Sequence, residues 1–169
     1  MHEEADEEDE GATAAQGSWK HELLETMHKM PPAAFERLSQ RILRESGFVE
    51  VRVTGRSGDR GIDGIGLLKL QGVLTFHVIF QCKRWQDPVG ASTVREFRGA
   101  MSGRTDKGLI ITTTYFTPEG IREATRDGVP PIDLIDGEAL VELLKRLRLG
   151  VKTEAVERVT VDEEWFNTI

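Results

Sequence analysis

The sequence lacks the features that mark secreted and membrane proteins. Cys82 is the single cysteine among 169 residues, so no disulfide can form within the chain. No apolar run approaches the ~18 residues that a membrane-spanning helix needs, and the first residues do not resemble a signal peptide. These absences exclude a disulfide-stabilised secreted fold and a membrane partner. They favour a reducing compartment, and we expect the protein in the cytoplasm.

The chain as a whole also lacks the positive charge that is typical of nucleic-acid-binding proteins, because its net charge is −7 at pH 7. The acidic residues are concentrated at the two ends. The first ten residues contain seven of them and no Lys or Arg, and residues 152–169 contain five against two basic residues. Between these tails, residues 11–151 contain 17 acidic and 20 basic residues. The middle of the chain is therefore weakly basic, which permits DNA binding without requiring it.

Composition divides the chain into three parts. Residues 1–17 contain almost no large apolar side chains and predict a disordered acidic tail. Two roles stay open for this tail: a solvated linker, which would also suit a domain that follows others in a longer protein, or an acidic arm that competes with nucleic acid for a basic surface. Residues 18–150 have the apolar content of one globular domain. Residues 151–169 form a C-terminal extension that either adds an edge strand or docks Trp165 and Phe166 on a neighbouring subunit.

Hydrophobic periodicity predicts both helices and strands over residues 18–150. Helical segments are expected at residues 18–29, 33–48, 92–103, 118–128 and 137–147. Strands are expected at residues 49–55, 62–70, 73–83, 108–114 and 131–136. The first three strands follow one another directly, and the later ones are separated by helices. This order predicts an α/β fold with a mixed central sheet flanked by helices.

Spacing also assigns some side chains to a face of their element. Val49, Val51 and Val53 alternate with polar residues, which predicts a half-buried strand. Arg95 and Arg98 lie outside the apolar stripe of segment 92–103. They are therefore expected either on a solvated helix face or in contact with phosphates.

Two consecutive strands predict a hairpin centred near Gly72. In an antiparallel hairpin with this centre Asp63 lies opposite Gln81, and facing residues have Cβ atoms ~4.5–5.5 Å apart. Side chains alternate along a strand, so Gln81 and Lys83 share one face and Cys82 points away. Asp63, Gln81 and Lys83 are therefore expected to converge at one end of the hairpin, unless the register slips by one residue.

These convergent side chains suit metal-assisted hydrolysis of a phosphodiester bond. Mg²⁺, with Mn²⁺ as a substitute, prefers oxygen ligands. Asp63 would supply a carboxylate, Gln81 a side-chain carbonyl and Cys82 a backbone carbonyl. Lys83 would orient the attacking water or stabilise the charge that builds on the phosphate. Taken separately, Asp63 also suits a turn in which it bonds its own backbone, and Lys83 a strand end from which it reaches solvent.

The surroundings of Asp63 also suit a DNA backbone. Glycines would let a phosphate chain approach closely at Gly58, Gly61, Gly64 and Gly66. Positive charge would come from Arg56, Arg60 and Arg84. We therefore expect these arginines to contact DNA phosphates.

Four blocks of sequence resemble the catalytic domain of the Mrr-like restriction endonucleases, a branch of the PD-(D/E)XK nuclease superfamily. The blocks are "FERLSQRILRESGF", "GDRGIDGIG", "HVIFQCKRW" and "GLIITTTYFTPEGIREA", and they follow the family's order within residues 33–150. The resemblance implies a restriction-endonuclease-like fold and Mg²⁺-dependent cleavage of double-stranded DNA, often modified DNA, as in a type IV restriction system. It assigns the metal-binding aspartate to Asp63 and the catalytic lysine to Lys83.

Gln81 stands where the wider superfamily usually has Asp or Glu, although glutamine is common in the Mrr-like branch. The glutamine removes one negative charge from the site. Glu36 matches the first-helix glutamate that points toward the site in this superfamily and would compensate; otherwise it is an exposed residue that pairs with Arg37 or Gln40. Gln81 also leaves a second function open, a non-catalytic DNA-binding or sensor module that retains the nuclease fold.

A threonine-rich strand end supplies further candidate DNA contacts. Thr113 and Thr114 precede a helix whose N-cap is expected at Thr117. Because a helix N-terminus attracts phosphate, Thr113 and Thr114 are predicted to contact the DNA backbone, with ordinary turn and capping chemistry as the alternative. Trp85 would either stack on a base or pack against the next helix.

The resemblance also bears on partners. Family members often carry a separate winged-helix DNA-binding domain before the nuclease domain, and none is visible in this sequence. Recognition of the target would then belong to another domain or a partner. Since one chain has one site, cutting both strands would need a homodimer, a higher homo-oligomer or two visits.

Overall fold

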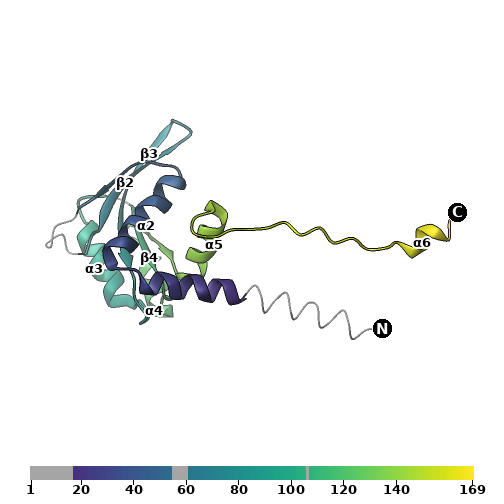
Figure 1. The fold of residues 1–169 in the computed structure, drawn as a ribbon. Coiled ribbons are helices and arrows are strands. Elements are labelled where there is room, and N and C mark those ends of the chain that lie inside the picture. Colours follow the sequence, from purple (N-terminus) through teal and green to yellow (C-terminus); the bar gives the residue numbers. More distant parts are fainter. Residues whose placement is uncertain (1–16, 55–60, 106) are drawn as a thin grey trace.

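The computed structural model describes residues 17–54, 61–105 and 107–169 (Figure 1). It begins with a helix over residues 17–29, so most of the predicted acidic tail lies outside the described residues. The elements that follow are α2 (Pro32–Glu45), β1 (Phe48–Val53), β2 (Gly64–Leu70), β3 (Leu74–Lys83), α3 (Ala91–Met101), β4 (Lys107–Thr112), α4 (Pro118–Ala124), β5 (Ile132–Ile135), α5 (Gly137–Leu147) and α6 (Glu163–Phe166). The predicted order of helices and strands up to α5 is confirmed.

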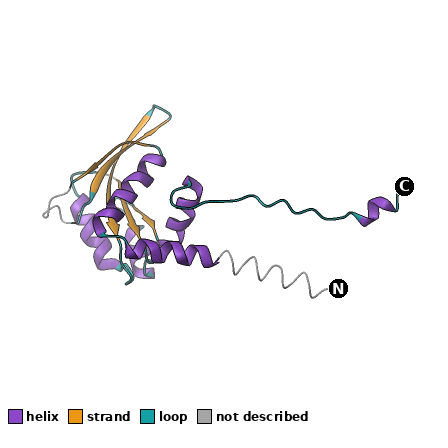
Figure 2. Cartoon of the chain, viewed as in Figure 1, coloured by secondary structure: helices purple, strands orange, loops and turns teal. Residues whose placement is uncertain are grey.

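The sheet has five strands in the order β1-β2-β3-β4-β5. The first three are antiparallel neighbours, whereas β3, β4 and β5 are parallel. β2 and β3 form the predicted hairpin in the expected register, with Gly64 opposite Phe80 and Leu70 opposite Leu74. Figure 2 shows the helices on both sides of this mixed sheet, which confirms the predicted α/β class. None of the helices in the described residues combines the length and the apolar character of a membrane span.

Alternating residues of β3 divide the core between the two faces of the sheet. On one face, Val78 and Phe80 pack with the N-terminal helix, α2 and α5. On the opposite face, Ile79 packs with α3 and α4. A strand that is covered on both faces needs no polar side, which explains the continuous apolar run before Gln81. At the end of β3, Gln81 continues the α3 face and Cys82 lies against the α2 face.

The edges of the molecule differ from two expectations. β1 is an edge strand with a bulge near Phe48, so Val51 is buried but Val49 and Val53 are exposed. The expected C-terminal edge strand does not form. Residues 151–162 have no regular structure and lead away from the sheet to α6 (Figure 1). From Val156 onward the large apolar residues of this extension are exposed, because no element of the described chain covers them.

Arg98 joins α3 to α4 and does not face solvent. Its guanidinium is largely buried and donates to the carbonyls of Glu123 (2.5 Å), Ala124 (3.3 Å) and Pro130. The carboxylate of Glu123 lies 3.6 Å from its Nε. Both roles predicted for Arg98, a phosphate contact or a solvated helix face, are therefore wrong, because packing of the two helices buries it.

Candidate active site

Asp63 lies where β1, β2 and β3 meet. Its backbone N–H donates to the carbonyl of Phe80 (3.0 Å), and its carbonyl accepts from the N–H of Thr54 (3.0 Å). Its carboxylate accepts a third bond, from the N–H of Cys82 to Oδ2 (2.5 Å). The next position, Gly64, needs a glycine because a Cβ there would collide with the ring of Phe80. Asp63 is thus fixed to β3 by its side chain as well as its backbone.

Burial raises the pKa of the Asp63 carboxyl, and the negative charge of Glu36 raises it further. The N–H of Cys82 and the ammonium of Lys83 act in the opposite direction. Glu36 is a half-buried residue of α2, so α2 brings a second carboxylate toward Asp63. Two carboxylates in a partly buried site repel each other, and a divalent cation would relieve that repulsion.

Gln81 is buried and only half satisfied. It is 6% exposed, and its Nε2 donates to the carbonyl of Gly61. Its Oε1 is buried and has no hydrogen-bond partner among the described residues. Gly61 has a φ of 81° and leaves no room for a Cβ beside this amide, which explains the glycine. A buried acceptor without a partner is unfavourable, so Gln81 Oε1 is a candidate ligand for a cation.

Gln81 and Lys83 line one side of a pocket of about 360 Å³, and α3 forms the other side. Burial lowers the pKa of the Lys83 ammonium, while the charges of Asp63 and Glu96 raise it. The Nζ of Lys83 lies 4.0 Å from the centroid of the Trp85 ring. A cation at this distance is attracted by the negative face of the ring. Lys83 therefore points into the pocket and not freely to solvent.

Glu96 is a further site residue, which was not predicted from the sequence. It lies on α3 and lines the same pocket as Lys83. Thr93, Glu96 and Ala100 recur at helical spacing, directly beside the apolar stripe that packs on the sheet. That second stripe was the available signal, but the sequence did not show which strand end it would face.

The oxygen atoms at this end of β3 suit a hard divalent cation. They include the Asp63 carboxylate, the unpartnered Oε1 of Gln81 and, from α2, the Glu36 carboxylate. Over residues 17–54, 61–105 and 107–169, no three His, Cys, Asp or Glu side chains form a possible metal site by themselves. The Gln81 amide and the backbone carbonyl of Cys82 would be needed to complete the ligand set.

The thiol of Cys82 does not belong to this ligand set. Its side chain faces away from Gln81 and packs against the α2 face. Burial raises the pKa of the Cys82 thiol to about 12. The protonated thiol is neither a metal ligand nor a nucleophile.

Thr113 and Thr114, the predicted DNA contacts at the end of β4, use their hydroxyls for bonds within the protein. Thr113 is 3% exposed, and its Oγ1 donates to the carbonyl of Trp85 (2.8 Å). Thr114 is partly exposed, but its Oγ1 donates to the carbonyl of Gln86 (3.1 Å). The end of the sheet buries Thr113, which fits the alternative of turn chemistry better than a phosphate contact. The hydroxyls bind carbonyls of the segment after β3 instead of a phosphate.

The predicted arginine contacts have different outcomes. Arg84 donates to the carbonyl of His28 in the N-terminal helix, so it ties that helix to β3. It alternates with Lys83 along the strand and lies on the opposite face, which explains why it does not join the pocket. Arg56 and Arg60 lie outside the described residues.

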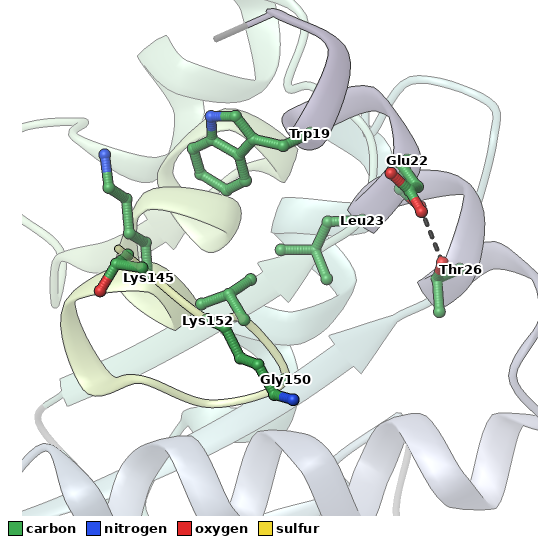
Figure 3. Close-up of a pocket in the computed structure, with 9 residues that line it drawn as sticks. Trp19, Glu22, Leu23, Thr26, Lys145, Gly150 and Lys152 are labelled. Atoms are coloured by element: carbon green, nitrogen blue, oxygen red, sulfur yellow. Dashed lines mark hydrogen bonds between the residues drawn. The ribbon is translucent and has the colours of Figure 1, made fainter. Parts of the chain in front are cut away.

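A second pocket, of about 330 Å³, lies between the N-terminal helix and the end of α5 (Figure 3). Trp19 and Leu23 point toward its centre, and Lys145 Nζ lies 5.3 Å from the Trp19 ring centroid. It shares no residue with the Lys83 pocket. It also has no buried carboxylate, and the chemistry argued above therefore belongs to the end of β3.

Comparisons with known proteins show the family to which the chain belongs. Residues 27–144 match the family model Mrr_cat, described as "Restriction endonuclease". The chain is 33% identical over 150 residues to the type IV methyl-directed restriction enzyme EcoKMrr of Escherichia coli K12, covering 86% of this chain and 48% of that protein. The chain thus spans about half the length of this curated relative.

Solved structures show the same fold. The MspJI restriction endonuclease, solved in complex with a 27-mer oligonucleotide, matches with a TM-score of 0.66 and 27% identity over 78% of this chain and 32% of that one. The DNA modification-dependent restriction endonuclease AspBHI matches with a TM-score of 0.62 and 24% identity over 78% of this chain and 36% of that one. The predicted restriction-endonuclease-like fold is confirmed, and the chain belongs to the Mrr family of restriction endonucleases.

Proposed function

We propose that the chain is a metal-dependent endonuclease that hydrolyses phosphodiester bonds of double-stranded DNA, with Mg²⁺ as its cofactor and Mn²⁺ as a substitute. The observation that carries the proposal is the bond from the Cys82 N–H to Asp63 Oδ2. It fixes a carboxylate at the end of β3 that also carries Gln81 and the half-buried Lys83, whose ammonium interacts with the Asp63 charge. Membership of a restriction endonuclease family favours this activity over a non-catalytic DNA-binding module.

In this proposal the metal ligands and Lys83 have separate roles. Asp63, Gln81 and the Cys82 carbonyl would hold the cation, and Glu36 would replace the negative charge that glutamine lacks. When bound, the cation would supply a polarised phosphate oxygen and a water of lowered pKa. The ammonium of Lys83 would donate hydrogen bonds to the phosphate as negative charge builds on it. The burial that lowers the pKa of Lys83 also strengthens this electrostatic contact.

We further propose methylated DNA as the substrate class, because relatives of this chain are named as methyl-directed and modification-dependent enzymes. Residues 18–150 would form the nuclease domain, and another domain or a partner would recognise the modification. Cleavage of both strands would use a homodimer or higher homo-oligomer. The DNA substrate and the free Cys82 would place this activity in the cytoplasm.

The experiment that tests the proposal is cleavage of supercoiled plasmid, methylated and unmethylated, with Mg²⁺, Mn²⁺ or EDTA. We expect nicked or linear product only with a divalent cation. Asp63→Asn should lower the cleavage rate by at least about 10³-fold, as the loss of an electrostatic group in a catalytic site does. The matched control is Asp127→Asn, which changes an exposed aspartate after α4 and should cleave normally.

Metal binding has its own readout. A cation that binds only the folded chain raises its Tm, so Mg²⁺ should stabilise the wild-type chain more than Asp63→Asn. DNA binding without cleavage under every metal and methylation state would overturn the proposed activity and favour the non-catalytic module.

A further inference from the structure

Three consecutive threonines hold the segment that follows β3. The backbone ladder between β3 and β4 ends at the pair Lys83 and Thr112. From that pair onward, threonine hydroxyls donate to the carbonyls of Lys83, Trp85 and Gln86. The bonds are Thr112 Oγ1 to Lys83 (2.9 Å), Thr113 Oγ1 to Trp85 (2.8 Å) and Thr114 Oγ1 to Gln86 (3.1 Å). We call Thr112, Thr113 and Thr114 the threonine clamp.

The threonine clamp is itself fixed by backbone bonds to β3 and α5. The Thr113 N–H donates to the Lys83 carbonyl (3.2 Å), and the Thr114 carbonyl accepts from the N–H of Gly137 at the start of α5 (2.7 Å). Thr112 is fully buried. Threonine is stiff at χ1 because it branches at Cβ. The path of residues 83–86 is therefore tied to β4 and α5.

The bond to Trp85 has a consequence for Lys83. It fixes the backbone of a residue whose ring faces the Lys83 Nζ at 4.0 Å. Lysine carries its charge on a long, flexible stem. An anchored aromatic face on one side and the pocket wall with Glu96 on the other restrict where that charge can lie.

We propose that the threonine clamp and the ring of Trp85 are positioning residues that fix the ammonium of Lys83 for the cleavage reaction. The inference rests on the proposed function, because it assigns these residues to the same site. The clamp touches neither substrate nor metal in this assignment and acts through Lys83. Trp85 likewise serves Lys83, in place of either role predicted for it, stacking on a base or packing on the next helix.

The burial of the clamp separates this role from a DNA contact. The Thr112 and Thr113 side chains are closed to a phosphate, and their hydroxyls already donate to carbonyls. A purely structural role would also use these bonds. It differs in predicting that loss of a hydroxyl changes the stability of the chain without changing the cleavage rate of the folded protein.

The test compares Thr113→Val, which keeps the shape of the side chain and loses the hydroxyl, with Thr113→Ser, which keeps the hydroxyl. We expect Thr113→Val to lower kcat on the plasmid by about 10- to 100-fold, as a misplacement of about 1 Å can do, with little change in KM. Thr113→Ser should retain most of the rate. The control is Thr125→Val, which removes a similar bond to the Ile121 carbonyl (3.0 Å) at the end of α4 and should cleave normally.

Trp85 provides a second variant that does not depend on a buried site, since its ring is 40% exposed. Trp85→Leu should lower kcat with little change in KM, whereas Trp85→Phe keeps an aromatic face and should retain most of the rate. A Trp85→Leu variant with raised KM and unchanged kcat would assign the ring to base stacking and overturn its positioning role.

The outcomes also separate the two proposals. If wild-type protein cuts DNA and Lys83→Ala does not, a wild-type kcat in folded Thr113→Val and in Trp85→Leu overturns the positioning inference alone. A wild-type protein that cuts no DNA overturns the proposed function and the inference together.

Discussion

The two ends of the β2–β3 hairpin share the same alternation of side chains and have opposite surroundings. At the tip, Leu70, Val73 and Leu74 are exposed beyond the helices (Figure 1). At the other end, the polar Gln81 is buried and Lys83 has a pKa lowered by burial. Apolar residues therefore face water at one end while polar residues are buried at the other. The positions of α2 and α3, and not the polarity of the strand, therefore determine which side chains of this hairpin are buried.

The largest expected effect compares two lysines of the hairpin. Lys83→Ala should lower DNA cleavage by at least about 10³-fold, because it removes the charge that we propose to stabilise the reacting phosphate. Lys69→Ala, at the exposed tip, should cleave like the wild type. Plasmid nicking rates and DNA affinity measured for both variants check this prediction. Equal rates in the two variants would contradict the assignment of the site to one end.

The next effect compares two thiols. Burial raises the pKa of the Cys82 thiol from 9.0 to about 12, so its thiolate fraction falls by about 10³-fold, and the thiolate is the reactive form. In Val73→Cys, the new thiol at the exposed tip should react with a disulfide reagent at pH 8 at least about 10-fold faster than Cys82 does, because the larger thiolate fraction outweighs the lower nucleophilicity of a less basic thiolate. Two well-separated phases would support this comparison. In urea, the two thiols should react at similar rates.

A smaller effect concerns two phenylalanines on the same face of β3. Phe80 is 1% exposed and Phe76 is 39% exposed. Phe80→Ala should lower the free energy of unfolding by about 3–5 kcal/mol, because it leaves a cavity in the core. Phe76→Ala should lower it by less than about 1 kcal/mol, since the residue is already partly in water. Urea unfolding of both variants measures the two values, and similar losses would show that the tip is covered in solution.

The smallest expected effect is the cost of burying the Asp63 charge. Because burial raises its pKa, the folded chain holds this proton more tightly than the unfolded chain, and stability falls as pH rises through the folded-state pKa. In metal-free buffer at neutral pH, Asp63→Asn should therefore have a slightly higher Tm than the wild type. The difference should disappear below the pH range in which unfolded aspartate titrates. A lower Tm for Asp63→Asn at neutral pH would contradict the shift.

Local pattern alone predicted much of the arrangement around Asp63. The centre of the hairpin at Gly72 and the alternation of β3 gave the register that the structure shows, with Gly64 opposite Phe80. The same alternation separated Cys82 from Gln81. These features depend on neighbours in one hairpin, whose geometry is nearly independent of the rest of the fold.

Contacts between distant elements were not predictable in the same way. Arg84 was assigned to DNA and Arg98 to phosphate or solvent, and each is bonded to a carbonyl of another element. A polar side chain has the same sequence signature whether it faces water or satisfies a buried backbone group. Only the packing of helices on the sheet distinguishes the two.

Three features could be predicted from the sequence alone: the α/β class, the hairpin register and the convergence of Asp63 with the end of β3. Those features follow from side-chain periodicity and short connections, which are local properties of the chain. Other features follow from the tertiary structure: Gln81 Oε1 has no partner within the part of the chain that is described, Glu96 lines the same pocket as Lys83, and three threonines hold the segment after β3. These depend on which surfaces exclude water and on contacts between residues far apart in the chain, and neither is encoded in a local pattern.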